Sequence, residues 1–346
     1  MRSARSFCAT ASETVRCVEL HRAKLVRCVW GEAMNIGRLH HITAVTANAR
    51  GNVQFYTKVL GLRLVKKTVN QDDVSAYHLF YGDAVGSPGT ELTFFDWPQA
   101  GANMPGSGTI GCMQLIVPDE AALYWWQQRF RELGVQQSPV ELYAGVQRLP
   151  FSDSEGQALA LVAATVGSSF QAWRDCPVPA QYAVRGLHSV VIRVQSAAPS
   201  VQMLESVLGM HKLPGADFGA QPGTSISVMG AADGPAVFVE ANTEFPAGRV
   251  GAGGVHHVAF RTADAAEQLR WRARLVANRV GVSQQIDRFY FQSIYFREPN
   301  GILYEIATDG PGFATDEEEA HLGERLALPP FLEAQRALIE AGLRPL

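Results

Sequence analysis

The chain has 346 residues, enough for about two ordinary domains, and its 47% hydrophobic and 18% charged residues are typical of a globular enzyme. A formal net charge of −3 gives no reason to expect a nucleic acid or an anionic membrane as partner, and no apolar stretch approaches the ~18 residues of a membrane span. The five cysteines lack CxxC spacing, which argues against a disulfide framework or a thiolate metal site and favours a cytoplasmic protein.

Residues 1–34 differ in character from the rest of the chain. They are rich in arginine and cysteine and show no clear apolar periodicity. They also lack the apolar core of a secretory signal, and Glu13, Glu19 and Glu32 argue against a transit peptide. We predict a disordered N-terminal tail.

An internal repeat begins after this tail. Residues 39–42 start an apolar run typical of a strand, and a helical pattern follows at residues 53–62. Adding 148 to each number leads to related segments at 187–190 and 201–210. In the first copy, Asn52 is suited to cap the helix and Gly61 to end it.

A second, fainter repeat has an offset of 145. It relates residues 119–126 to residues 264–271, Cys112 to His257, and Ala160 to Glu305. Together the repeats divide the chain into four modules, each reading as strand, helix and three strands (βαβββ). The modules start near residues 38, 109, 186 and 254.

The predicted fold class is α+β, with four βαβββ modules in two tandem domains. Each module alone would expose one face of its sheet, so the modules must pair to bury it. The predicted segments after the tail are an N-terminal domain at 35–170, a linker at 171–185, a C-terminal domain at 186–312, and a C-terminal tail with a helix at 313–346.

One position in the repeat points to metal chemistry. The four equivalent first-strand residues are His41, Cys112, Ser189 and His257. Imidazoles therefore occur in modules one and four only, and Glu305 in the last strand of module four replaces Ala160 of module two. Two histidines and one carboxylate suit a divalent metal, and they leave open positions that a closed structural zinc site lacks. Such a site requires module one to pack beside module four.

Simpler explanations exist for each of these residues. A histidine in an apolar strand is usually a packed, hydrogen-bonded core residue, and a buried Glu305 could be neutralised by an arginine instead of a metal. A second metal site at Glu240 is not expected, because Ser189 stands where module three would need a histidine.

Three segments resemble the vicinal oxygen chelate superfamily, which includes extradiol dioxygenases, glyoxalases and antibiotic-resistance proteins. They are LHHI at 39–42, VHHV at 255–258 and EPNGILYE at 298–305. A narrower resemblance is to ring-cleaving dioxygenases of the hydroquinone 1,2-dioxygenase type. It rests on VKKT at 65–68, YHLFYGD at 77–83, GSPGT at 86–90, and tail segments at 312–313, 316–319, 322–323 and 328–330.

The resemblance implies a fold of two tandem domains of the vicinal oxygen chelate type and the metal ligands His41, His257 and Glu305. It also implies catalytic roles beside the metal for Thr43, His256, Arg288 and Tyr295, and for His40. Tyr295 could hydrogen-bond a phenolic hydroxyl, Arg288 could stabilise developing negative charge, and His256 could shuttle a proton. As plain alternatives, Arg288 could be a surface charge and Tyr295 a packing residue. Strict strand alternation turns His40 and His256 away from the metal face, so a twist or a bulge at the start of the strand would be needed.

The implied activity is a ring-cleaving dioxygenase that uses Fe(II), or alternatively Mn(II), to insert O₂ into a hydroquinone- or catechol-type ring. Its partners are a small aromatic dihydroxy substrate and O₂, and the sequence leaves a homo-oligomer open. Two other functions stay open: a glyoxalase-type lyase or isomerase, and a non-enzymatic resistance protein that binds an aromatic molecule. We also expect the acidic segment 316–319 to cover the entrance of the site.

Overall fold

The structure, a computed structural model, describes residues 34–165, 170–213, 222–231 and 234–346. By its contacts the chain divides into two units, residues 1–35 and residues 36–346, and all four modules lie in the second unit. The expected disordered tail lies outside the described residues, apart from Met34. In the part of the chain that the structure describes, no helix is long and apolar enough to span a membrane.

Strand, helix and three strands recur four times, as the repeats predict. Module one contains β1 (Leu39–Thr46), α2 (Ala49–Gln54), η1 (Phe55–Val59), β2 (Arg63–Asn70), β3 (Asp73–Gly82) and β4 (Glu91–Asp96). Module two contains β5 (Thr109–Val117), α3 (Glu120–Glu132), β6 (Glu141–Tyr143), β7 (Val146–Ser152) and β8 (Ala158–Ala163). Module three contains β9 (Gly186–Val194), α4 (Ala197–Ser206), β10 (His211–Lys212), β11 (Ser225–Ala231) and β12 (Gly234–Ala241). Module four contains β13 (Gly254–Thr262), α5 (Ala265–Ala277), β14 (Ile286–Asp287), β15 (Gln292–Arg297) and β16 (Leu303–Thr308).

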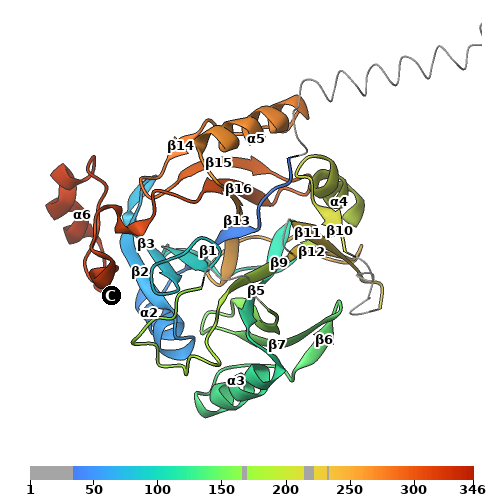
Figure 1. Ribbon diagram of the computed structural model, residues 1–346, viewed down its shortest axis with the longest axis horizontal. Helices are drawn as coiled ribbons and strands as arrows, with labels where there is room; N and C mark the ends of the chain where they lie inside the picture. The colour runs from blue at the N-terminus through green and yellow to red at the C-terminus, as the bar shows by residue number, and fades with distance from the viewer. Residues whose placement is uncertain (1–33, 166–169, 214–221, 232–233) are drawn as a thin grey trace, which may run out of the picture. The chain divides into compact units, whose positions relative to one another are not determined.

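Two eight-stranded sheets hold these modules in pairs (Figure 1). Modules one and four form the first sheet, in the order β14-β15-β16-β13-β1-β4-β3-β2. Modules three and two form the second sheet, in the order β10-β11-β12-β9-β5-β8-β7-β6. Each sheet is joined at its centre by an antiparallel pair of first strands, β1 with β13 and β5 with β9. The α+β class and the pairing of module one with module four are thereby confirmed.

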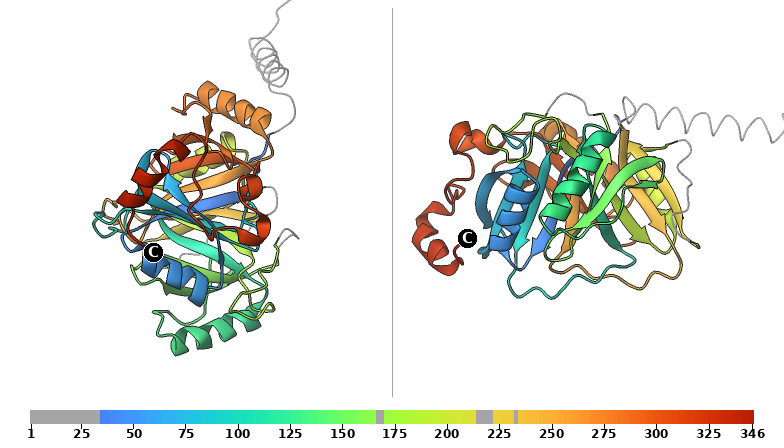
Figure 2. Two further views of the ribbon diagram at one scale, coloured as in Figure 1. Left: turned by 90° about the vertical axis from the view of Figure 1, so that its left-hand side faces the viewer. Right: turned by 90° about the horizontal axis from the view of Figure 1, so that it is seen from below.

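The long helices pack on one face of each sheet (Figure 2). Helix α5 contacts β13, β15 and β16, and helix α3 contacts β7 and β8. Apolar residues three or four positions apart form the buried stripe of each helix: Trp271 and Leu275 on α5, and Trp126 and Phe130 on α3, are fully buried. With this face occupied by helices, the opposite face of the first sheet is available for polar side chains.

The first helix begins earlier than the sequence predicts. Its cap is Asn48, whose side chain accepts a hydrogen bond from the Gly51 backbone N–H at 3.0 Å. The prediction that Asn52 caps the helix is wrong, because Asn52 lies inside the helix and its Oδ1 accepts a bond from the Tyr81 hydroxyl at 2.8 Å. The predicted end is confirmed, since Gly61 has a φ of +75°.

The C-terminal tail packs along the edge strand β2. It contains the short helices η2 (Phe313–Thr315), η3 (Glu319–His321), η4 (Glu333–Gln335) and α6 (Arg336–Gly342). The Ala327 N–H donates to the Lys67 carbonyl at 2.9 Å, and Leu328, Leu332 and Ile339 bury Val69. The tail therefore covers an edge that would otherwise expose unpaired backbone groups.

Candidate metal centre and substrate pocket

Two β-bulges shape the centre of the first sheet. The pairing of β1 with β13 skips His40 on one strand and His256 on the other, so each is the extra residue of a bulge. This local break in alternation removes the objection that His40 and His256 must point away from the metal face. Each of these histidines instead lies beside the histidine that follows it.

His41, His257 and Glu305 converge on the free face of this sheet. The Nε2 atoms of His257 and His41 lie 3.0 Å and 3.4 Å from Glu305 Oε2. All three side chains are buried, and Ser293 donates a hydrogen bond to Glu305 Oε1. Burial by itself raises the pKa of Glu305, but the imidazoles of His41 and His257 outweigh it and hold that pKa well below its usual range. Glu305 is therefore a carboxylate.

The donor set fits a divalent cation. Glu305 Oε2 is buried and accepts no hydrogen bond, although two imidazole nitrogens face it. An unpartnered buried carboxylate oxygen is costly, and a metal shared with the two imidazoles would remove that cost. These ligand atoms, one from each residue, all lie within 4.8 Å of one another.

Neighbouring histidines set which ring nitrogen of each ligand is free. His40 Nε2 lies 3.1 Å from the Thr308 carbonyl and must donate, which leaves His40 Nδ1 as an acceptor. His40 Nδ1 is 2.9 Å from His41 Nδ1, so His41 donates from Nδ1, and its Nε2, which faces Glu305, is the nitrogen that would bind a metal. Burial, the first cause, lowers the pKa of His40 to about 3, and His40 is therefore neutral.

The second ligand has a similar partner. His256 Nδ1 lies 2.8 Å from His257 Nδ1, and its ring contacts Phe95 and Trp97 edge-on. Burial lowers the pKa of His256 to about 3. His256 is not among the residues that line the pocket. This placement suits His256 to orienting His257 and not to shuttling a proton, which is the role we expected.

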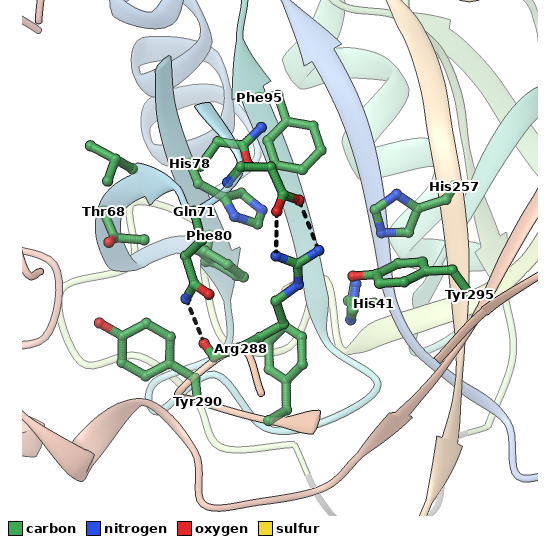
Figure 3. Close-up of a pocket in the computed structure, with 14 residues that line it drawn as sticks. His41, Thr68, Gln71, His78, Phe80, Phe95, His257, Arg288, Tyr290 and Tyr295 are labelled. Atoms are coloured by element: carbon green, nitrogen blue, oxygen red, sulfur yellow. Dashed lines mark hydrogen bonds and ion pairs between the residues drawn. The ribbon is translucent and has the colours of Figure 1, made fainter. Parts of the chain in front are cut away.

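A pocket lies against the two ligand histidines (Figure 3). The residues that line it are His41, Thr68, Val69, Asn70, Gln71, Asp72, His78, Phe80, Phe95, His257, Arg288, Tyr290, Phe291 and Tyr295. Its aromatic walls suit an aromatic ring. The acidic segment 316–319 is absent from this lining. Its first two residues, Asp316 and Glu317, contact Lys66 instead.

Tyr295 and Arg288 both reach the pocket, whereas Thr43 does not. Burial and the charge of Glu305 raise the pKa of Tyr295, so the phenol is a hydrogen-bond donor at neutral pH. The Arg288 guanidinium lies 5.5 Å from the Tyr295 ring and pairs with Asp72. Arg288 also precedes a strained residue, because Phe289 has a φ of +71°. Both side chains therefore line the pocket, and their roles beside the metal stay predictions.

His78 is a pocket residue that our sequence reasoning did not assign. Its Nε2 lies 3.1 Å from the Thr93 hydroxyl, which in turn lies 2.8 Å from the Thr43 hydroxyl. The ring is held between Phe80 and Phe95, at centroid distances of 4.0 Å and 4.5 Å. Burial lowers the pKa of His78 well below its usual value. A chain of hydrogen bonds through Thr93 and His78 thus connects Thr43 to the pocket. The sequence signal was a histidine in an otherwise apolar strand.

The second sheet lacks the corresponding ligands. Cys112 and Ser189 occupy the equivalent first-strand positions there, and Ser189 accepts a bond from Gln114 at 2.8 Å. The Glu240 carboxylate accepts a hydrogen bond from Arg193 at 2.9 Å, and this arginine neutralises its charge without a metal. Within the described ranges, the other group that could hold a metal is His40, His41 and Glu91. It uses His40 Nδ1, which lies 4.0 Å from Glu91, and burial raises the pKa of Glu91 well above its usual value.

The chain matches the family model described as "Glyoxalase/Bleomycin resistance protein/Dioxygenase superfamily" at residues 38–157 and 186–306. The protein named "Putative ring-cleaving dioxygenase MhqA" of Bacillus subtilis is 43% identical over 90% of this chain and 100% of its own length. The "Chlorohydroquinone/hydroquinone 1,2-dioxygenase" of Sphingobium indicum is 33% identical over 85% of this chain and 92% of its own.

Solved structures agree with this grouping. A crystal structure described as a "putative dioxygenase" from Bacillus subtilis has a TM-score of 0.80 at 35% identity and covers 90% of this chain and 98% of that one. Glyoxalase I from Zea mays, at 16% identity and a TM-score of 0.59 over 83% of this chain and 96% of that one, shares the fold. The chain therefore belongs to the Glyoxalase/Bleomycin resistance protein/Dioxygenase superfamily and, within it, to the ring-cleaving dioxygenases that these relatives represent.

Proposed function

We propose that the chain cleaves the ring of a hydroquinone- or catechol-type aromatic with O₂, and that His41, His257 and Glu305 hold the Fe(II), or alternatively Mn(II), that this reaction needs. The observation that carries the proposal is the buried, unpartnered Glu305 oxygen facing two imidazole nitrogens. The hydroquinone substrate is suggested by the printed name of the Sphingobium relative.

A divalent ion held by these three residues supplies, when bound, neighbouring open positions for a substrate oxygen and O₂. The protein's own residues bind and orient the ring. Phe80, Phe95 and Phe291 provide apolar walls that exclude bulk water from the reacting atoms. Holding both reactants in one geometry supplies a large part of the rate enhancement.

Two polar side chains act on the charge of the ring. The protonated Tyr295 phenol donates a hydrogen bond to a ring oxygen, which stabilises the phenolate form of the substrate. Arg288 lies beside Tyr295 and stabilises negative charge that develops as the ring opens, while its pairing with Asp72 limits how strongly it attracts a further anionic group. His78, neutral and packed between two phenylalanines, can accept a hydrogen bond from the substrate hydroxyl.

The test is anaerobic reconstitution with Fe(II) or Mn(II), followed by metal analysis and an O₂ electrode with a panel of hydroquinones and catechols. The wild-type chain should hold about one ion and consume O₂ with a ring substrate. Glu305→Gln keeps the shape of the side chain but removes its negative charge. Loss of the outer hydrogen-bond partner of a ligand costs up to ~100-fold in metal affinity, and loss of the ligand's own charge should cost more than that.

Glu240→Gln is the matched control, because it removes a partly buried carboxylate from the second sheet. It should retain both the ion and the activity. A Glu305→Gln protein that still binds one ion and opens rings would overturn the proposal.

A further inference from the structure

An ion pair spans the rim of the pocket between two modules. Asp72 lies in the turn between β2 and β3, and Arg288 lies between β14 and β15. Two nearly parallel contacts join them, 3.2 Å from Nη1 to Oδ1 and 2.9 Å from Nη2 to Oδ2. Gln71 adds a third contact by donating to the Arg288 carbonyl at 2.8 Å. Figure 3 shows Arg288 reaching across the pocket that contains His41 and His257.

The charges around the pocket are balanced by this pair. Among the described residues that line it, and apart from the histidines, Arg288 is the one cation and Asp72 the one carboxylate. Lys66 lies behind Tyr290, 4.7 Å from the centre of that ring, and both Asp316 and Glu317 contact it. A second negative group on a substrate would therefore find no uncompensated cation.

A ring in this pocket must come close to the ion pair. Asp72 and Arg288 line the same pocket as His41 and His257, and the free space between these residues is only about 40 Å³. A ring bound against the ligand histidines therefore lies near Asp72 and Arg288. An acidic substituent there would be attracted by Arg288 but repelled by Asp72, at distances where charges interact strongly.

We propose that Asp72 is a specificity-determining residue: by neutralising Arg288 it makes the site select hydroquinones without acidic substituents over those with a ring carboxylate. This inference rests on the proposed function, because it takes the pocket as the substrate site. Asp72 acts through Arg288 and is a positioning residue. Its side chain is 73% exposed, so its removal should cost the fold little.

The experiment compares two ligands of similar shape, a dihydroxybenzoate and the corresponding dihydroxybenzamide, on the full-length, metal-reconstituted protein. Binding is measured anaerobically by titration, and kcat/KM is measured with O₂. Asp72→Asn should raise the ratio of benzoate to benzamide affinity about tenfold, and high salt should weaken this change because it screens exposed charges.

Asp73→Asn is the matched control. Asp73 is the exposed next residue, the first of β3; its carboxylate contacts Ser75, and it does not line the pocket. This variant should leave the ratio at its wild-type value. If Asp72→Asn also leaves the ratio unchanged, or weakens both ligands equally as a purely structural residue would, the inference is wrong. The anaerobic affinities test the role of Asp72 separately from ring cleavage, so they remain decisive even if no O₂ uptake is seen.

Discussion

His40 offers a residue-scale test of how the metal ligands are oriented. It accepts a hydrogen bond from His41 Nδ1 and donates one to the Thr308 carbonyl, so it keeps His41 Nε2 free for a metal. His40→Phe preserves a buried ring but removes the acceptor. We expect metal affinity to fall about 10–100-fold, as is typical when the outer partner of a ligand histidine is lost. Anaerobic metal titration measures the change.

His188 provides the control for this prediction. It is the equivalent bulge residue of the second sheet, and its Nδ1 lies 2.8 Å from the Ser189 hydroxyl, where the described residues form no candidate ligand set. His188→Phe should leave metal affinity unchanged. Equal affinities for the two variants would show that His40 does not orient His41.

The sequence could predict which residues meet but not how each ring is turned. Comparing the four modules selects His41, His257 and Glu305, because only there do the repeats place imidazole and carboxylate groups. Strict alternation misplaces His40 and His256, because a bulge depends on the partner strand. His78 was not assigned because its role comes from Thr93 and Phe95, which reach it only after the strands pair.

At the scale of elements, ion pairs of one buried lysine attach the C-terminal tail to the first sheet. Lys66 on β2 is fully buried and contacts Asp316 and Glu317, and Arg325 approaches Glu317 from the exposed side. Glu317→Gln removes one of the two carboxylates that neutralise this lysine. Breaking a buried ion pair usually costs 3–5 kcal/mol, so the free energy of unfolding should fall by about 3 kcal/mol. Urea denaturation tests this.

The neighbouring Glu318 is exposed and supplies a control with the same change of charge. Glu318→Gln should alter stability by no more than about 0.5 kcal/mol. A Glu317→Gln protein as stable as this control would mean that the buried contacts contribute nothing to the attachment of the tail.

Elements with strong local signals were predictable, and those defined by tertiary contacts were not. Helix α5 (Ala265–Ala277) begins within the repeat segment 264–271 that the sequence identifies, and its cap Asp264 accepts a hydrogen bond from the Glu267 N–H. The first helix was misplaced because Asn48 and Asn52 are both good caps, and only the contact of Asn52 with Tyr81 distinguishes them. The contact of the acidic tail residues with Lys66 could not be predicted, because Lys66 is 250 positions earlier in the sequence than Asp316.

At the scale of the whole molecule, the candidate metal site joins strands from the first and last modules, while the second sheet repeats the same topology without the ligands. Binding to the folded state alone stabilises it, by about 2.7 kcal/mol at an ion concentration 100 times Kd. Metal should therefore raise Tm, and hydrogen exchange should slow most in β1, β13 and β16. Their counterparts β5, β9 and β12 form an internal control, because the same fold surrounds them without a candidate ligand set. In His41→Ala both responses should disappear. Equal protection of the two sheets, or an unchanged response in His41→Ala, would place the ion elsewhere, because an ion held by His41, His257 and Glu305 restrains the first sheet directly.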